Sequence, residues 1–91
     1  MLRITIRVDE HGTAMELAGR LAGPWVQELA RCWEEAAAVE RKLSVMLLEV
    51  TYIDAAGRGL LAEMHRRGTE IEASGCLNKA IVEQIKKRKA R

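Results

Sequence analysis

The feature that most constrains the fold is the short apolar run Val45–Leu48, which has polar residues on both sides. A run of this length, too short for a typical buried helix, favours a strand whose two faces are both covered. We therefore expect a central strand here, followed by a loop over Thr51–Asp54. Because the chain has 91 residues, it has room for one domain around such a strand and not for two.

The N-terminal segment predicts a β-hairpin. Apolar residues alternate with Arg and Thr over Leu2–Val8, which is typical of a strand with one solvated face. Turn-forming residues follow at Asp9–Gly12, and a second strand is expected over Thr13–Ala18. The segment Gly19–Gly23 breaks the alternation, so we expect the second strand to end before it.

Two helices are predicted on either side of the central strand in the sequence. The first is expected over Pro24–Val39, because proline suits a first helical position whose N–H needs no partner. The second is expected from Ala55 to about Arg67. Asp54 can cap its start by accepting an early backbone N–H, and Gly68 can end it.

The C-terminal part predicts a short strand and a third helix. The strand is expected over Thr69–Ser74, where Glu70 and Glu72 would protect a sheet edge from foreign strands. Ser74 can cap the last helix, which runs out into the basic C-terminus. The order ββαβαβα predicts an α/β fold, with a four-stranded mixed sheet flanked by three helices and with the later strands parallel.

Charge is unevenly distributed along the chain. Five of the fifteen basic residues lie within Lys86–Arg91, and the rest of the chain is weakly acidic. We therefore divide the chain into a domain over residues 1–86 and a basic tail over residues 87–91. The tail could contact nucleic acid or an anionic membrane surface. A helix end whose cations complement the helix dipole explains it more simply, so we do not expect nucleic-acid binding.

Few residues suit catalysis or metal binding. His11 and His65 are the only histidines, and no Ser or Cys lies at an activating spacing. Cys32 and Cys76 lack metal-ligand spacing, so we expect reduced thiols. We expect no enzymatic activity, no catalytic residues, no metal and no cofactor. Neither a secretory leader nor a membrane-length apolar run stands out, which makes the cytoplasm the expected compartment, without membrane insertion.

The residues best placed for function lie where the central strand gives way to the second helix. Small residues at positions 55 to 57 expose the first-turn N–H groups, at the positive end of the helix dipole. Such a surface suits a phosphate or a partner's carboxylate, although close packing at a capped helix start explains the same pattern. The expected partner-binding residues are Asp54, Ala55, Ala56, Gly57 and Arg58, with contributions from Thr51, Tyr52, Gly19, Arg20 and Gly23 on connections at the same edge.

The segment Leu47–Leu61 resembles the signature of STAS domains, the family of bacterial anti-sigma-factor antagonists and of the cytoplasmic ends of sulfate transporters. In the antagonists, an apolar strand leads through an acidic residue to Asp-Ser-Ser/Thr-Gly-Leu-Gly and a helix. The element order is also similar, as are Gly19–Leu21 after the second strand and Gly68 before the last. The resemblance therefore covers nearly the whole chain. It implies a STAS-like fold and a non-enzymatic, protein-binding role in the regulation of transcription.

One position departs from the antagonist pattern. The serine that a partner kinase phosphorylates in those proteins, which switches binding off, corresponds to Ala55 here, and Ala56 follows it. Neither residue can accept a phosphate, so the phosphorylation position is lost. The resemblance implies an anti-sigma factor or kinase as the partner. The domain would then be either locked in the binding state or a constitutive scaffold.

A second function stays open at this point. STAS-like proteins also accompany lipid and anion transporters as accessory subunits, and the same surface would then dock on an ATPase subunit. The sequence does not separate the two functions. In either case we expect a protein partner, no small-molecule substrate, and a monomer or weak homodimer.

Overall fold

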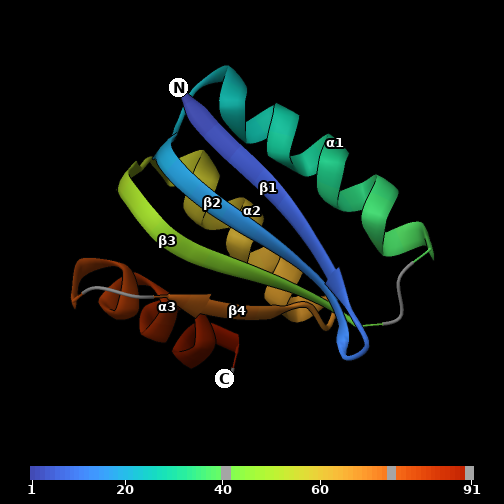
Figure 1. Cartoon of the computed structure of the whole chain (residues 1–91). Helices are drawn as coiled ribbons and strands as arrows, with labels where there is room; N and C mark the ends of the chain where they lie inside the picture. Colours follow the sequence, from blue (N-terminus) through green and yellow to red (C-terminus); the bar gives the residue numbers. More distant parts are fainter. Residues whose placement is uncertain (40–41, 74–75, 90–91) are drawn as a thin grey trace.

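The computed structural model describes residues 1–39, 42–73 and 76–89 of the chain (Figure 1). The described residues form, in order, β1 (Leu2–Asp9), β2 (Gly12–Leu21), α1 (Pro24–Val39), β3 (Leu43–Ile53), α2 (Ala55–Arg66), β4 (Glu70–Ala73) and α3 (Cys76–Lys89). The predicted α/β class and element order are confirmed. The predicted cap at Ser74 lies outside the described residues.

The strands form a mixed sheet in the order β1-β2-β3-β4. β1 and β2 are antiparallel and form the predicted hairpin, whereas β3 runs parallel to both β2 and β4. β4 is an edge strand, and Glu70 and Glu72 are exposed on it as expected. No helix within the described ranges is long and apolar enough to cross a bilayer.

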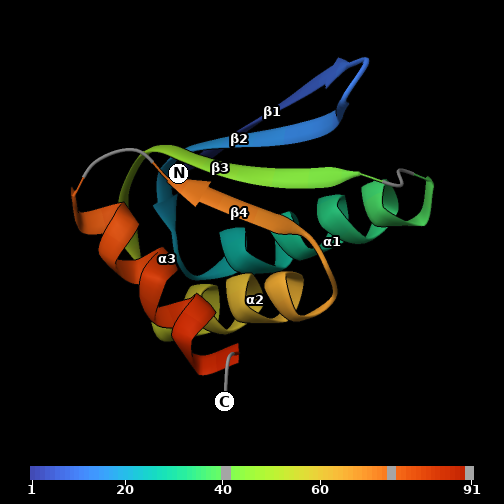
Figure 2. The ribbon, with the colours of Figure 1, turned by 90° about the horizontal axis from the view of Figure 1, so that it is seen from below.

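All three helices lie on one face of the sheet, as Figure 2 shows. The prediction that both faces of the central strand are covered is therefore wrong. Val45 and Leu47 are fully buried against the helices, but Met46 is half-buried and Leu48 is 37% exposed. The apolar run was misleading because large apolar side chains also occur on surfaces that no helix covers.

The strands β2 and β3 both extend further than the sequence predicts. The expected loop over residues 51–54 is wrong, because β3 continues to Ile53 and pairs there with Leu21 at the end of β2. The pairing contains two register shifts, at which Leu48 and Thr51 of β3 have no counterpart in β2. After each extra residue, the inward-facing side chains shift by one position along β3. The alternation of apolar and polar residues is therefore interrupted in the sequence, although the strand continues.

The hairpin end of β1 lies away from the helix layer (Figure 2). Leu2 is buried and Ile4 is half-buried, but Ile6 is 49% exposed and Val8 is 71% exposed. The expectation of a single solvated face therefore fails toward the turn, where both faces of β1 meet solvent.

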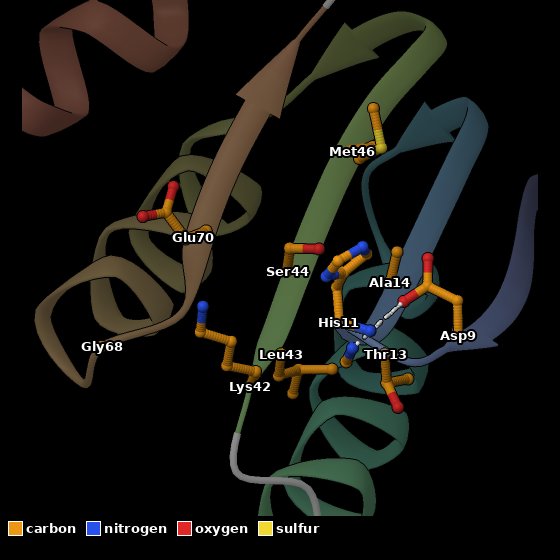
Figure 3. A pocket seen from close by; sticks show the side chains of 11 residues that line it. Asp9, His11, Thr13, Ala14, Lys42, Leu43, Ser44, Met46, Gly68 and Glu70 are labelled. Atoms are coloured by element: carbon orange, nitrogen blue, oxygen red, sulfur yellow. Dashed lines mark hydrogen bonds between the residues drawn. The ribbon is translucent and has the colours of Figure 1, made fainter.

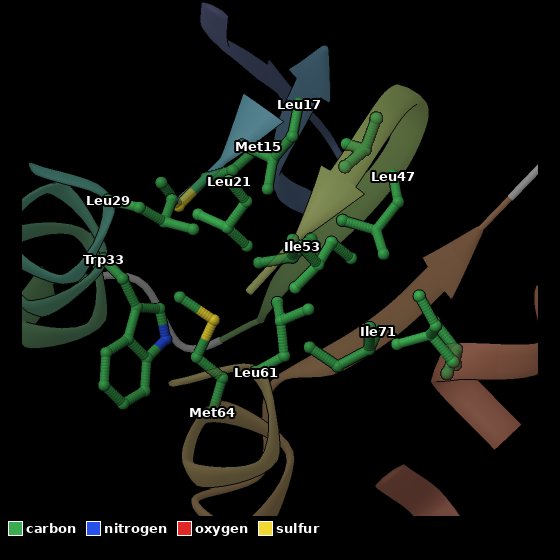
Figure 4. Packing of buried hydrophobic residues seen from close by; sticks show 14 of the residues in the cluster. Met15, Leu17, Leu21, Leu29, Trp33, Leu47, Ile53, Leu61, Met64 and Ile71 are labelled. Carbon is green, nitrogen blue, oxygen red and sulfur yellow. The ribbon is translucent and has the colours of Figure 1, made fainter. Parts of the chain in front are cut away.

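The core between the sheet and the helices is almost entirely aliphatic, with one large aromatic side chain (Figure 4). Trp33 of α1 is buried against the core, and its indole N–H donates a hydrogen bond of 2.9 Å to the hydroxyl of Thr69. The guanidinium of Arg67 lies over the indole, 4.7 Å from the ring centroid. These contacts join α1 to the end of α2 and to the segment that leads into β4.

Removing the acceptor of this buried hydrogen bond tests its contribution to stability. Thr69→Val leaves the Trp33 indole N–H buried without a partner, so we expect the free energy of unfolding to fall by about 1–3 kcal/mol. Thr13→Val is the matched control, because the buried hydroxyl of Thr13 has no hydrogen-bond partner within the described part of the chain. That change should be neutral or stabilising by up to about 1 kcal/mol. Urea denaturation measures the free energy of unfolding of both variants. Equal losses of stability in the two variants would contradict a stabilising hydrogen bond between Trp33 and Thr69.

Candidate functional site

Asp54 fixes the start of α2 through hydrogen bonds to two separate segments. One carboxylate oxygen, Oδ1, accepts from the backbone N–H of Gly57 at 2.7 Å, which is the N-cap interaction expected from the sequence. The other oxygen, Oδ2, accepts from the backbone N–H of Gly23 at 3.0 Å. The backbone N–H of Asp54 also donates to the carbonyl of Leu21 at 3.1 Å. Asp54 therefore ties α2 to the connection between β2 and α1.

These donors favour the charged form of the carboxylate. The pKa of Asp54 lies below its ordinary value because the backbone N–H groups of Gly23 and Gly57 hydrogen-bond to the ionised side chain. Each oxygen already accepts a hydrogen bond from the chain itself. The main role of Asp54 in this geometry is thus to position the surface around it.

The three small residues at the start of α2 have different surroundings. Gly57 is buried, and a Cβ added there would lie 2.9 Å from both the Ile53 side chain and the Leu21 carbonyl oxygen. Close packing therefore explains Gly57. Ala55 and Ala56 are exposed, and close packing does not account for them. The predicted surface is open to solvent at these two positions.

The ends of β2 and β3 bring the other predicted residues to the same edge. Gly19, Arg20, Thr51 and Tyr52 belong to strands, so their assignment to connections is wrong, whereas Gly23 does lie between β2 and α1. The Thr51 hydroxyl donates to the Gly19 carbonyl at 3.3 Å. The guanidinium of Arg20 lies 4.9 Å from the centroid of the Tyr52 ring. Strand pairing thus gathers residues that are far apart in the sequence.

Gly19 allows β1 to approach this edge closely. Its φ is +110°, and a Cβ there would come within 2.3 Å of the Met1 carbonyl oxygen. The neighbouring N–H of Arg20 donates to that same carbonyl at 2.9 Å. A side chain at position 19 would therefore separate the start of β1 from β2.

The exposed part of the site combines small, aromatic and cationic groups. Arg20, Arg58 and the two alanines are exposed, and Tyr52 is 47% exposed. Two cationic side chains, Arg20 and Arg58, surround one carboxylate, Asp54, which stays ionised because it accepts the N–H groups of Gly23 and Gly57 at the positive end of the α2 dipole. The surface is electropositive in balance and suits a carboxylate better than a cation.

A hollow that the sequence did not indicate lies at the opposite end of the sheet (Figure 3). It has a volume of about 490 Å³ and lies beside the hairpin turn, where Asp9 accepts hydrogen bonds from the backbone N–H groups of His11 and Gly12. Lys42 and Glu70 give it charges of both signs. The turn and the starts of three strands supply its lining, so no contiguous motif could have indicated it. Across the described residues, no three His, Cys, Asp or Glu side chains form a group suited to a metal ion.

Adding a methyl group at each of two glycines in α2 tests the close packing at its start. Gly57→Ala should lower the free energy of unfolding by about 1–3 kcal/mol, because the new Cβ meets Ile53 and Leu21. Gly59→Ala is the matched control, since a Cβ there meets nothing within 4 Å. It should stabilise the protein by roughly 0.5–1 kcal/mol through higher helix propensity. Thermal and urea denaturation of both variants measure this, and stabilisation by Gly57→Ala would be incompatible with the packing described.

The lowered pKa of Asp54 predicts how its contribution to stability varies with pH. A carboxyl group whose pKa is lower in the folded state stabilises the fold at neutral pH. That stabilisation declines as the pH falls below the ordinary value of 3.8 toward the folded pKa. Asp54→Ala should therefore be less stable than the wild type near neutral pH, and the difference should narrow in acid. Urea denaturation over a pH series measures the difference in unfolding free energy between the wild type and Asp54→Ala. A difference that widens as the pH falls would contradict the lowered pKa.

Comparison with known proteins adds no family assignment to this geometry. A scan against protein-family models found no match to the chain, and a search of curated proteins found none either. The function proposed below therefore depends on the residues and contacts described above.

Proposed function

We propose that the chain is a non-enzymatic, STAS-type domain that binds a protein partner through the start of α2. The observation that carries this proposal is the exposure of Ala55 and Ala56 on a helix start that Asp54 holds in place. Two adjacent small exposed side chains leave the first-turn backbone accessible to a partner. Arg58, Arg20 and Tyr52 provide longer side chains around that point.

The position of this surface in the fold supports the proposal. In α/β sheets with parallel strands, binding sites gather beyond the carboxyl ends of the strands. The start of α2 follows the carboxyl end of β3 directly, and β2 ends beside it through the pairing of Leu21 with Ile53. The element order is also the one implied by the resemblance of Leu47–Leu61 to the STAS signature.

The absence of a hydroxyl group at positions 55 and 56 gives the proposed function its particular character. Phosphorylation would add negative charge at this point and repel an acidic partner. Because Ala55 and Ala56 cannot be phosphorylated, binding at this surface is constitutive. Control must then act on the amount of the domain or on the partner.

The charge of the surface indicates the chemistry of the partner. Arg20, Arg58 and the positive end of the α2 dipole favour a segment that presents carboxylates. An anti-sigma factor with an ATP-binding kinase fold is the partner that we propose, on the basis of the resemblance. The nucleotide-binding subunit of a transporter would dock through the same chemistry.

A negative charge at position 55 should abolish the interaction without unfolding the protein. Ala55→Asp imitates the charge of a phosphate, and an acidic residue in the first turn of a helix is compatible with folding. We expect affinity for the partner to fall roughly tenfold or more. Ala37→Asp is the matched control, because Ala37 is an exposed alanine near the far end of α1. Ala55→Ser should restore sensitivity to a partner kinase.

Affinity purification from the native cell with the wild type and these variants identifies the partner, and titration calorimetry measures its affinity. An anti-sigma kinase captured by the wild type and by Ala37→Asp, but lost by Ala55→Asp, supports the proposal. If a transporter ATPase is captured with the same pattern, the proposed surface is supported but the partner is the ATPase and not an anti-sigma kinase. Equal affinity of the wild type and Ala55→Asp for the captured protein shows that this surface is not the interface.

A further inference from the structure

The outer edge of β1 presents backbone groups in a fixed alternation. The N–H of Arg20 donates to the carbonyl of Met1, one position beyond the terminal pair of the β1–β2 register, Leu2 with Gly19. Hydrogen-bonded and non-hydrogen-bonded pairs alternate along an antiparallel ladder. The odd-numbered residues of β1 therefore direct their N–H and C=O groups at β2. The even-numbered residues Ile4, Ile6 and Val8 direct theirs outward.

The residues with outward backbone groups also carry exposed apolar side chains. Ile6 is 49% exposed and Val8 is 71% exposed, and strand alternation places both on the same face of β1 as the buried Leu2. The other edge of the sheet differs, because β4 has only four residues and carries Glu70 and Glu72. A long edge strand with an exposed apolar row is a template for pairing with another strand. β1 thus combines free hydrogen-bonding capacity with apolar surface.

We propose that a second copy of this chain pairs with β1, antiparallel and about a two-fold axis at Ile6. In this register Ile6 faces Ile6 of the second copy, and Ile4 faces Val8, so the exposed apolar row is covered from both sides. On the other face of the sheet, Arg3 of each copy lies opposite Asp9 of the second copy. Opposite charges directly across a strand pair stabilise it, and symmetry makes this pair occur twice.

Other registers are less favourable. An axis at Thr5 sets Arg3 opposite Arg7, and an axis at Arg7 sets that residue opposite itself, so like charges meet in both. An axis at Ile4 leaves Val8 without an apolar partner, whereas an axis at Val8 places Ile6 opposite Glu10 in the turn.

The side chains on the open face are already arranged for this register. Arg7 is paired with Glu16 of β2 at 3.0 Å, which offsets the repulsion between the two Arg7 side chains near the axis. Asp9 is held at the end of β1 by accepting the N–H groups of His11 and Gly12 through Oδ1. The eight-stranded sheet that results leaves the start of α2 outside the contact between strands. This proposal is therefore independent of the proposed function.

The proposed charge pair makes the association testable by sedimentation equilibrium of the full chain over a concentration series. We expect the wild type to dimerise and Arg3→Glu, which sets two negative charges opposite each other, to weaken the dimer roughly tenfold or more. Asp9→Asn keeps an acceptor for the turn but removes its charge, and it should weaken the dimer by a smaller factor. Lys79→Glu, an exposed charge reversal on α3, is the control and should leave the dimerisation constant unchanged.

Amide hydrogen exchange of the wild type, measured by NMR at low and high protein concentration, locates the contact without any substitution. The N–H groups of Ile4, Ile6 and Val8 should become protected as the concentration rises, whereas those of Thr5 and Arg7 should be protected throughout. A chain that stays monomeric at millimolar concentration overturns the proposal. A dimer in which the N–H of Ile6 exchanges as rapidly as in the monomer also overturns it. The same holds for a dimer whose dissociation constant is unchanged by Arg3→Glu.

Discussion

The double hydrogen bond of Asp54 is the constraint on which the proposed functional surface depends. Its two carboxylate oxygens hold the N–H groups of Gly57 and Gly23, which belong to the start of α2 and to the connection after β2. Because the two segments lie on different helix–strand junctions, one side chain sets their relative position. The ionised carboxylate is stabilised by both donors, so the arrangement is strongest where Asp54 is charged.

These hydrogen bonds fix the position of a helix start that carries exposed small residues. Gly57 is packed against Ile53 and Leu21, which leaves no room for a side chain there. Ala55 and Ala56 face solvent on the same turn. A partner can therefore approach the backbone closely at a point whose geometry is already set, which lowers the entropy cost of binding. The absence of a hydroxyl group makes this a permanent docking surface in the proposed function.

The one-sided arrangement of the helices shapes the rest of the molecule. With all three helices on one face, the opposite face of the sheet is not covered by a helix (Figure 2), and β1 is an edge strand of the sheet. Ala14 and the turn after β1 are part of the lining of a hollow at the starts of β2 and β3. The exposed row formed by Ile6 and Val8 is the apolar part of this open structure, and pairing with a second copy would cover it.

The sequence by itself determined the type, order and approximate bounds of the elements. Pro24 and Asp54 mark helix starts, Gly68 follows α2, and the alternation over Leu2–Val8 marks the first strand, because these signals act through neighbouring backbone atoms. The cap at Asp54 was predictable for the same reason. Its second hydrogen bond, to Gly23, was not, because the two residues are 31 positions apart.

Only the tertiary structure decided which surfaces are covered. The apolar run at Val45–Leu48 is the same whether helices lie on one face of the sheet or on both, and the helices' placement leaves Leu48 partly exposed. The extra residues Leu48 and Thr51 in β3 become visible only against the register of β2. Burial and register are properties of pairs of distant segments, whereas periodicity reports on one segment at a time.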